Sequence, residues 1–282
     1  MTPPPLPPKN ILVCLSTGPR AVALAGEAAA LARAYGAGSL HAVHAGADSP
    51  ATRRQLEAIV RETGWEGELH LLLEDRKPAE AALHAARKAN ADLVVAGALE
   101  KEKLTRELFG STARQLARKM PLPVMLLTNP RPEGTAYKRL GISTQLDKPT
   151  RLAMEFTIDL ARRMGTGELH LLRESSYFDR AEKRWSPVQH GGTMTSTSLL
   201  ELQTFAESFD FGTLKLTLAE LGEGEGFAAA DYGRTQHLDL LVYPSPPRTL
   251  TFWDRFFNHS IELVLEHLPH ALLIHRPKQR GA

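Results

Sequence analysis

The chain of 282 residues has one cysteine, Cys14, which excludes an internal disulfide and fits a reducing cytoplasm. No apolar run approaches the roughly 20 residues that a membrane-spanning helix needs. The charges nearly cancel, with 34 basic and 32 acidic residues spread along the chain, so nucleic acid is not an expected partner. These absences predict a soluble, cytoplasmic protein that binds neither membranes nor nucleic acid.

Other short features favour structural interpretations. Cys14 lies in the apolar run Ile11 to Leu15 and is interpreted as a buried filler rather than a nucleophile. Residues 1–8 are rich in proline and lack the features of a secretory signal, so we expect a short disordered tail. The basic cluster Arg276 to Arg280 is expected to be a solvated tail.

The sequence repeats itself once. Lys9 to Val43 matches Lys138 to Leu172 at a shift of 129 positions, and Phe109 to Leu127 matches Phe257 to Ile274 at a shift of about 148. The repeat predicts two units, residues 9–129 and 136–277, joined by Pro130 to Thr135. The second unit carries a polar insertion around residues 174–198, which we expect to be a surface loop.

Within each unit, apolar strands alternate with amphipathic or alanine-rich helices. In the first unit we expect strands at 10–16, 39–45, 68–74, 92–96 and 122–128, and helices at 20–35, 50–63, 78–90 and 111–119. Five strands that alternate with helices predict an α/β fold, a five-stranded parallel sheet with helices on both faces, Rossmann-like or flavodoxin-like. Ligands of such folds bind beyond the carboxyl ends of the strands where the strand order reverses, here at the loops after the first and fourth strands.

One of those loops carries a motif typical of phosphate binding. In the first unit it reads Gly97-x2-Glu100-x9-Gly110-Ser111-Thr112, and its last residues open a helix. Glycine lets the backbone approach a phosphate, and a helix start presents amide hydrogens to an anion. The matching stretch of the second unit, Ser245-x2-Arg248-x9-Asn258-His259, has no glycine. Any ligand site should therefore be confined to the first unit.

Together, the first strand, the alanine-rich helix, Asp92 to Gly97, Phe109 to Thr112 and Pro121 to Leu127 resemble the universal stress protein family in its tandem form. The resemblance implies a non-catalytic role in the stress response and adenine-nucleotide binding, without a required metal. It also implies pairing of the two units through their last strands, Pro123 to Leu127 with Ala271 to His275, or a homodimer. The implied nucleotide-binding residues are Ser16, Val43, Gly97, Glu100, Gly110, Ser111 and Thr112.

Two of these residues depart from the family pattern. Glu100 replaces a glycine, and a carboxylate about 6 Å from a phosphate would cost roughly 2 to 3 kcal/mol at an effective dielectric near 20. Such a cost weakens binding on the order of 100-fold. Ser16 replaces an aspartate, which removes about 1 kcal/mol of charge-assisted hydrogen bonding. ATP or a related nucleotide is thus expected to bind weakly, and in the first unit only.

The alternative function is a nucleotide-free scaffold. Under this alternative, the aromatic residues between Phe252 and Phe257, or the insertion near Trp185, contact another chain. The structural interpretation of the aromatic residues is that they pack between the two units. Enzymatic activity is not expected, because the sequence has no Walker A loop and no nucleophile elbow, and we find no base that would activate water for a slow ATPase. Gly222 to Gly226 is interpreted as a turn, and the histidines lack the partners of a metal site.

Overall fold

The computed structural model describes residues 7–98, 111–174, 196–221, 227–245 and 271–277. Several residues discussed above lie outside these ranges: Glu100, Gly110, most of the insertion with Trp185, the turn 222–226, Arg248, the aromatic residues 252–257, and Asn258 with His259.

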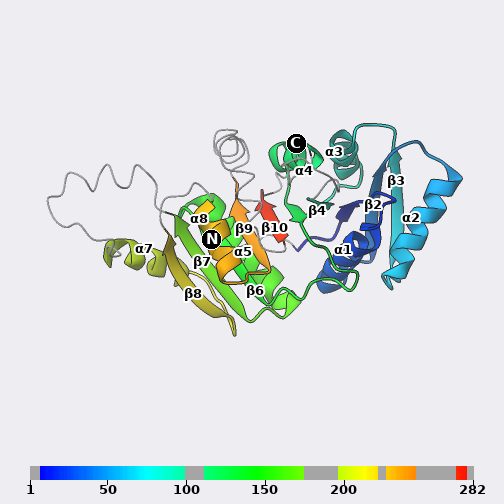
Figure 1. The fold of residues 1–282 in the computed structure, drawn as a ribbon. Coiled ribbons are helices and arrows are strands. Elements are labelled where there is room, and N and C mark those ends of the chain that lie inside the picture. The colour runs from blue at the N-terminus through cyan, green and yellow to red at the C-terminus, as the bar shows by residue number, and fades with distance from the viewer. Residues whose placement is uncertain (1–6, 99–110, 175–195, 222–226, 246–270, 278–282) are drawn as a thin grey trace.

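A single ten-stranded sheet forms the centre of the molecule (Figure 1). The strands of the first unit are β1 (Ile11–Cys14), β2 (Ser39–Ala45), β3 (Glu68–Glu74), β4 (Leu93–Gly97) and β5 (Val124–Leu127). Those of the second unit are β6 (Arg139–Thr144), β7 (Glu168–Glu174), β8 (Lys215–Leu221), β9 (Leu240–Pro244) and β10 (Ala271–His275).

Helices connect the strands in both units. They are α1 (Ala21–Tyr35), α2 (Pro50–Glu62), α3 (Pro78–Lys88), α4 (Ser111–Lys119), α5 (Lys148–Met164), α7 (Ser196–Ala206) and α8 (Phe227–Thr235). Helices α1, α2, α5 and α7 pack against one buried cluster, and α3, α4 and α8 pack against the other. The sheet thus lies between two helical layers, as the predicted fold class requires.

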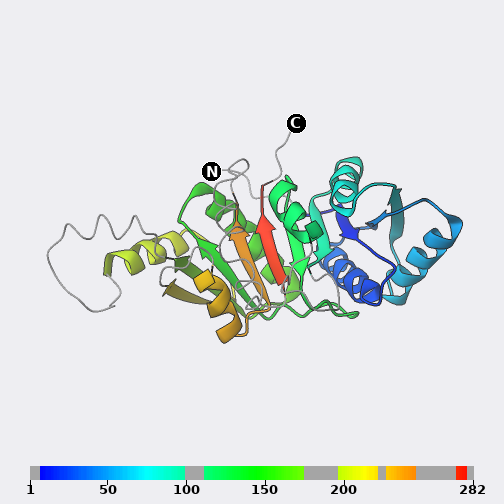
Figure 2. The ribbon, with the colours of Figure 1, turned by 45° about the horizontal axis from the view of Figure 1, so that its top comes forward.

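The strand order is β3-β2-β1-β4-β5-β10-β9-β6-β7-β8. Pairing is parallel within each unit, and the two halves are related by the same order read from opposite edges. At the centre, β5 pairs antiparallel with β10, with Leu127 opposite Ala271 and Val124 opposite Ile274 (Figure 2). The α/β fold with two five-stranded parallel units is confirmed, and the units share one continuous sheet.

Local chemistry explains why the element bounds follow the sequence closely. The Ser49 hydroxyl accepts a hydrogen bond from the Thr52 amide at 3.1 Å, and Pro50 begins α2. Gly36 ends α1 with a φ of 63°, a conformation that glycine adopts without strain. Strands β2 and β3 and helix α4 have the predicted bounds, whereas β1 and β5 are shorter than predicted.

The segment that joins the units is fixed to helix α1. Glu27 is fully buried, and its carboxylate accepts hydrogen bonds from the amides of Arg131 and Thr135, at 3.0 and 2.9 Å, and from the hydroxyls of Thr135 and Tyr137. One helix turn therefore organises residues 131–137 before β6 begins. No helix among the described residues has the length and apolar character that crossing a membrane requires.

Candidate functional site

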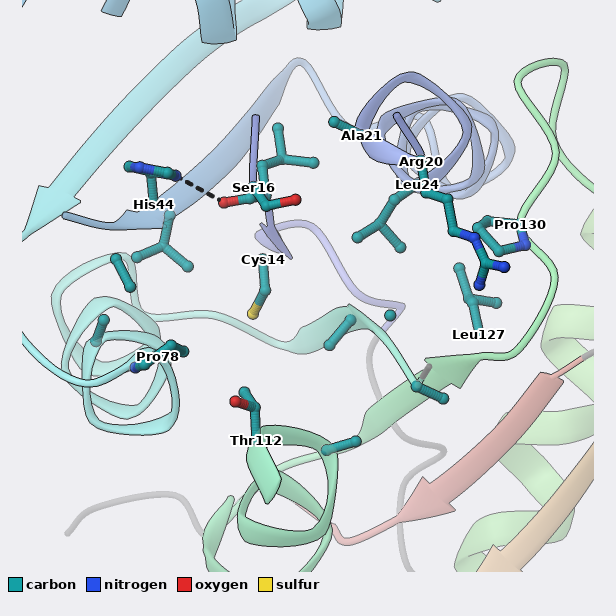
Figure 3. Close-up of a pocket in the computed structure, with 18 residues that line it drawn as sticks. Cys14, Ser16, Arg20, Ala21, Leu24, His44, Pro78, Thr112, Leu127 and Pro130 are labelled. Atoms are coloured by element: carbon teal, nitrogen blue, oxygen red, sulfur yellow. Dashed lines mark hydrogen bonds between the residues drawn. The ribbon is translucent and has the colours of Figure 1, made fainter. Parts of the chain in front are cut away.

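A cavity lies at the carboxyl ends of β1 and β4, where the strand order of the first unit reverses (Figure 3). Its volume is about 250 Å³. It is lined by Cys14, Leu15, Ser16, Arg20, Ala21, Leu24, Val43, His44, Ala45, Pro78, Ala81, Ala96, Gly97, Ala98, Thr112, Ala113, Leu127 and Pro130. This is the position at which doubly wound folds bind ligands.

The composition of the lining suits a flat ligand with a polar end. Six of the lining residues are alanines, whose small side chains leave the space open, and four more are leucines or valine. Hydroxyl groups come from Ser16 and Thr112, and one guanidinium comes from Arg20. Pockets with mostly apolar walls and a few polar groups are typical of small-molecule sites.

The structure places four of the seven predicted binding residues in this lining. They are Ser16 after β1, Val43 in β2, Gly97 at the end of β4 and Thr112 in the first turn of α4. Ser111 is exposed at the start of α4 and is not a lining residue. Glu100 and Gly110 lie outside the described residues, so their roles stay predictions.

Gly97 is not required by the fold itself. Its φ is not positive, and a Cβ built on it would meet only Leu24 Cδ2, at 3.8 Å, an ordinary van der Waals contact. The space above the Gly97 backbone is therefore free, and a ligand could approach it closely. Close approach of a phosphate to the backbone is the reason why Gly97 was predicted to be a binding residue.

Two polar lining residues were not predicted as part of the site. Arg20 immediately precedes α1, and His44 follows Val43 in β2. The Nδ1 atom of His44 lies 3.0 Å from the Leu15 carbonyl oxygen, which can only accept, so Nδ1 carries the hydrogen of the neutral ring. Their positions in the sequence could have indicated both residues, because Arg20 lies between β1 and α1 and His44 lies near the end of β2. The glycine motif, which begins at the end of β4, covers neither position.

Cys14 also belongs to the cavity wall, and its residue is partly buried. Burial of the sulfur raises the pKa of its thiol to about 12. Only the thiolate is a strong nucleophile, and burial disfavours that form of Cys14 near neutral pH. Its interpretation as a residue without nucleophilic chemistry agrees with this environment.

In the second unit, the sheet register places Pro244 at the position of Gly97. Gly97 pairs with Leu127 in β5, and Pro244 pairs with His275 in β10. The sequence alignment had placed Ser245 there, one residue further along. The second unit therefore has proline where the first has glycine, which removes a backbone donor and restricts φ.

Large side chains replace two of the lining alanines in the second unit. The same register places Tyr243 at the position of Ala96 and Glu174 at the position of Ala45. Tyr243 is 1% exposed, and burial, followed by the nearby Glu174 carboxylate, raises the pKa of its hydroxyl well above the usual value. Glu174 is buried and accepts a hydrogen bond from the Ala229 amide at 2.8 Å. Two alanines of the first cavity are thus replaced by a phenol ring and a carboxylate.

Metal ligands do not gather at the cavity. Within the described residues, no group of three or more His, Cys, Asp or Glu side chains is placed to hold a metal ion. His41 stacks on His70 at a centroid distance of 4.7 Å, whereas His44 bonds to Leu15, so these two histidines of β2 serve different contacts.

Comparison with known proteins finds a family match for the first unit and similar solved structures for the whole chain. A model of the universal stress protein family matches residues 8–128. A universal stress protein from Archaeoglobus fulgidus superposes with a TM-score of 0.64 at 12% identity, covering 96% of this chain and 97% of its own.

Two proteins from Pseudomonas aeruginosa superpose at least as well. One, a universal stress protein by its description, has a TM-score of 0.67 at 17% identity and covers 96% of this chain and 94% of its own. The other, of unknown function, has a TM-score of 0.69 at 17% identity and covers 96% of this chain and 93% of its own. At these identities the likeness establishes the fold of the whole chain. No curated protein matches the sequence.

Proposed function

Because residues 8–128 belong to the universal stress protein family and the second unit repeats their fold, we propose that this tandem protein is a non-catalytic regulator of the stress response. Its first unit binds an adenine nucleotide weakly, and its second unit serves structure. The observation that supports this division most directly is the cavity at the β1–β4 switch point of the first unit. The same place in the second unit holds Tyr243 and Glu174.

The polar groups of the lining support binding rather than turnover. Hydrolysis of a nucleotide needs a base that activates water, within hydrogen-bond reach of the reacting phosphate. The described lining residues include no carboxylate. We therefore expect phosphate release from ATP to stay at the level of a protein-free control.

Two further parts of the proposal concern location and assembly. The single cysteine supports a reducing cytoplasm. In the sheet, β5 and β10 already satisfy each other's backbone groups, so the strand edge that relatives commonly use for pairing is occupied within the chain. A homodimer would have to use a different surface, and β3 and β8 are the strands at the two ends of the sheet.

Calorimetric titration of the full chain with ATP tests the proposal. A valine at position 97 should lower ATP affinity by about 10-fold or more, because its side chain fills the space above the backbone that a phosphate would approach. The fold should tolerate this change, since Gly97 lies in a strand without a positive φ, and valine suits strands. The melting temperature without ligand should therefore stay close to that of the wild type.

The matched control is Gly38→Val. Gly38 also has no positive φ, a Cβ there would meet nothing within 4 Å, and it precedes β2, at the opposite end of the strands from the cavity. This variant should bind ATP as the wild type does. Absence of any binding by the wild-type protein at millimolar ATP would contradict nucleotide binding and favour the scaffold alternative.

A further inference from the structure

The cavity of the first unit contains one charged side chain among its described lining residues, the guanidinium of Arg20. Arg20 immediately precedes helix α1, and in Figure 3 its side chain extends past Pro130 toward Leu127. Leu127 pairs with Gly97 in the sheet. The guanidinium thus lies on the β5 side of the cavity, next to the strand that pairs with β4.

Arg20 has no counterion among the described residues. Other described arginines form ion pairs, such as Arg53 with Asp48 and Arg139 with Glu168. No carboxylate or carbonyl oxygen of the described chain accepts from the Arg20 side chain, and α1 has no acidic residue in its first turn. An exposed arginine without a partner is common, but this one lines a cavity at the switch point of the sheet.

The helix starts around the cavity add to the positive potential of Arg20. Ala21 and Pro78 are the first residues of α1 and α3, and Thr112 is the second residue of α4. All three line the cavity. The amino-terminal end of a helix carries roughly half a positive charge, and neither α1 nor α4 has an acidic residue in its first turn. Helix α3 has Glu80 in its first turn, so the dipoles of α1 and α4 are the ones that act together with the guanidinium on the cavity.

The second unit lacks this cation. At the shift of 129 positions that relates β1 to β6, Arg20 corresponds to Pro149. Pro149 belongs to the same unit as Tyr243 and Glu174, which replace two alanines of the first cavity. The open cavity and the unpaired guanidinium thus occur in the same unit, as expected if both serve one ligand.

We propose that Arg20 is the anion anchor of the cavity: it binds the phosphate group of a nucleotide or a related phosphate ester. This inference rests on the proposed nucleotide site and assigns its charge recognition to the β1–α1 side. A guanidinium can bind two phosphate oxygens through parallel hydrogen bonds, which a serine at position 16 cannot do.

The test compares three probes, ATP, adenosine and inorganic tripolyphosphate, on the full chain with Arg20→Gln and Arg20→Lys. In Arg20→Gln, loss of a charge-assisted hydrogen bond should lower the affinity for ATP and for tripolyphosphate by about 10-fold to 100-fold. Adenosine affinity should change by less than about twofold. Arg20→Lys should fall between the wild type and Arg20→Gln, because it keeps the charge but not the two parallel bonds.

Arg33→Gln is the matched control, since Arg33 lies in the last turn of the same helix, is exposed, and does not line the cavity. Its affinities should equal those of the wild type. The dependence of ATP affinity on salt should also become shallower in Arg20→Gln, because one ionic contact is lost.

Different failures have different meanings. Unchanged ATP affinity in Arg20→Gln, or an equal loss for adenosine and ATP, would overturn the role of Arg20 and leave nucleotide binding in place. Binding of tripolyphosphate that depends on Arg20, without binding of ATP or adenosine, would retain the anion anchor and contradict the adenine-nucleotide proposal. Binding of none of the three probes by the wild-type protein would overturn both.

Discussion

Glu27→Ala is expected to lower the free energy of unfolding by about 3 to 5 kcal/mol, because three buried donors would lose their acceptor at about 1 to 3 kcal/mol each. The donors are the amide and hydroxyl of Thr135 and the hydroxyl of Tyr137. Burial, followed by the Glu27 carboxylate, raises the pKa of Tyr137 well above its usual value, so its hydroxyl keeps the proton that it donates. Urea unfolding followed by circular dichroism measures the change.

Glu27→Gln should also destabilise the protein, by about 2 kcal/mol, because the amide nitrogen would face groups that themselves donate. The control is Glu62→Gln in α2, where the side chain is exposed and the expected change is within about 0.5 kcal/mol. A loss of less than about 1 kcal/mol in Glu27→Ala would show that residues 131–137 do not depend on this carboxylate.

Glu27 illustrates what the sequence could not predict. The repeat identified Pro130 to Thr135 as the junction between the units, but the hydrogen-bond partners of Glu27 lie 104 to 110 residues further along the chain. Nothing in the composition of an alanine-rich helix indicates which glutamate is buried. Gly26 precedes it, and a Cβ at Gly26 would lie 1.8 Å from the Pro132 carbonyl oxygen, so close packing of the junction explains that glycine as well.

Local features, by contrast, were predictable because their causes are local. Ser49 with Pro50, the left-handed Gly36 and the apolar runs of β2 and β3 act within a few residues, and the observed elements follow them. The alternation of strands and helices then specified a parallel sheet and its switch point. Both the fold and the position of the cavity could therefore be predicted from the sequence.

The contents of the two crevices could not be predicted in the same way. Equivalence of Tyr243 with Ala96 depends on a register of 147 positions, which the sheet defines, whereas the alignment suggested about 148. A shift of one residue moves a strand side chain to the opposite face of the sheet. Arg20 was overlooked for a different reason. It is far from Gly97 in the sequence, and the two residues line one cavity only because β1 and β4 lie side by side in the sheet.

Acid should destabilise the protein through His275, the last residue of β10. This side chain is 2% exposed, its Nδ1 atom has no hydrogen-bond partner among the described residues, and its ring packs against Phe156 at a centroid distance of 5.0 Å. Burial lowers the pKa of His275 from 6.5 to about 4. The unfolded chain then binds the proton more tightly than the folded protein does, so protonation favours unfolding.

The effect of His275 therefore appears only below its unfolded pKa. It is absent above pH 6.5, grows as the pH falls from 6.5 toward about 4, and reaches about 3 kcal/mol below that range. Between pH 7.5 and pH 4.5 the wild type should lose about 2 to 3 kcal/mol more stability than His275→Leu, which keeps a buried side chain but cannot be protonated. Urea unfolding at the two pH values measures this difference.

Comparison of pH dependences, rather than of stabilities at one pH, separates protonation of His275 from repacking around the new side chain. The control is His237→Asn, because His237 is exposed and has a φ of 53°, which asparagine also tolerates. Between the two pH values, His237→Asn should lose as much stability as the wild type does. If His275→Leu showed the same loss, the acid sensitivity would have to come from other groups, such as carboxylates or His41 and His170, whose pKa values burial also lowers. A smaller loss in His275→Leu alone would assign that part of the acid sensitivity to protonation of His275 in the unfolded chain.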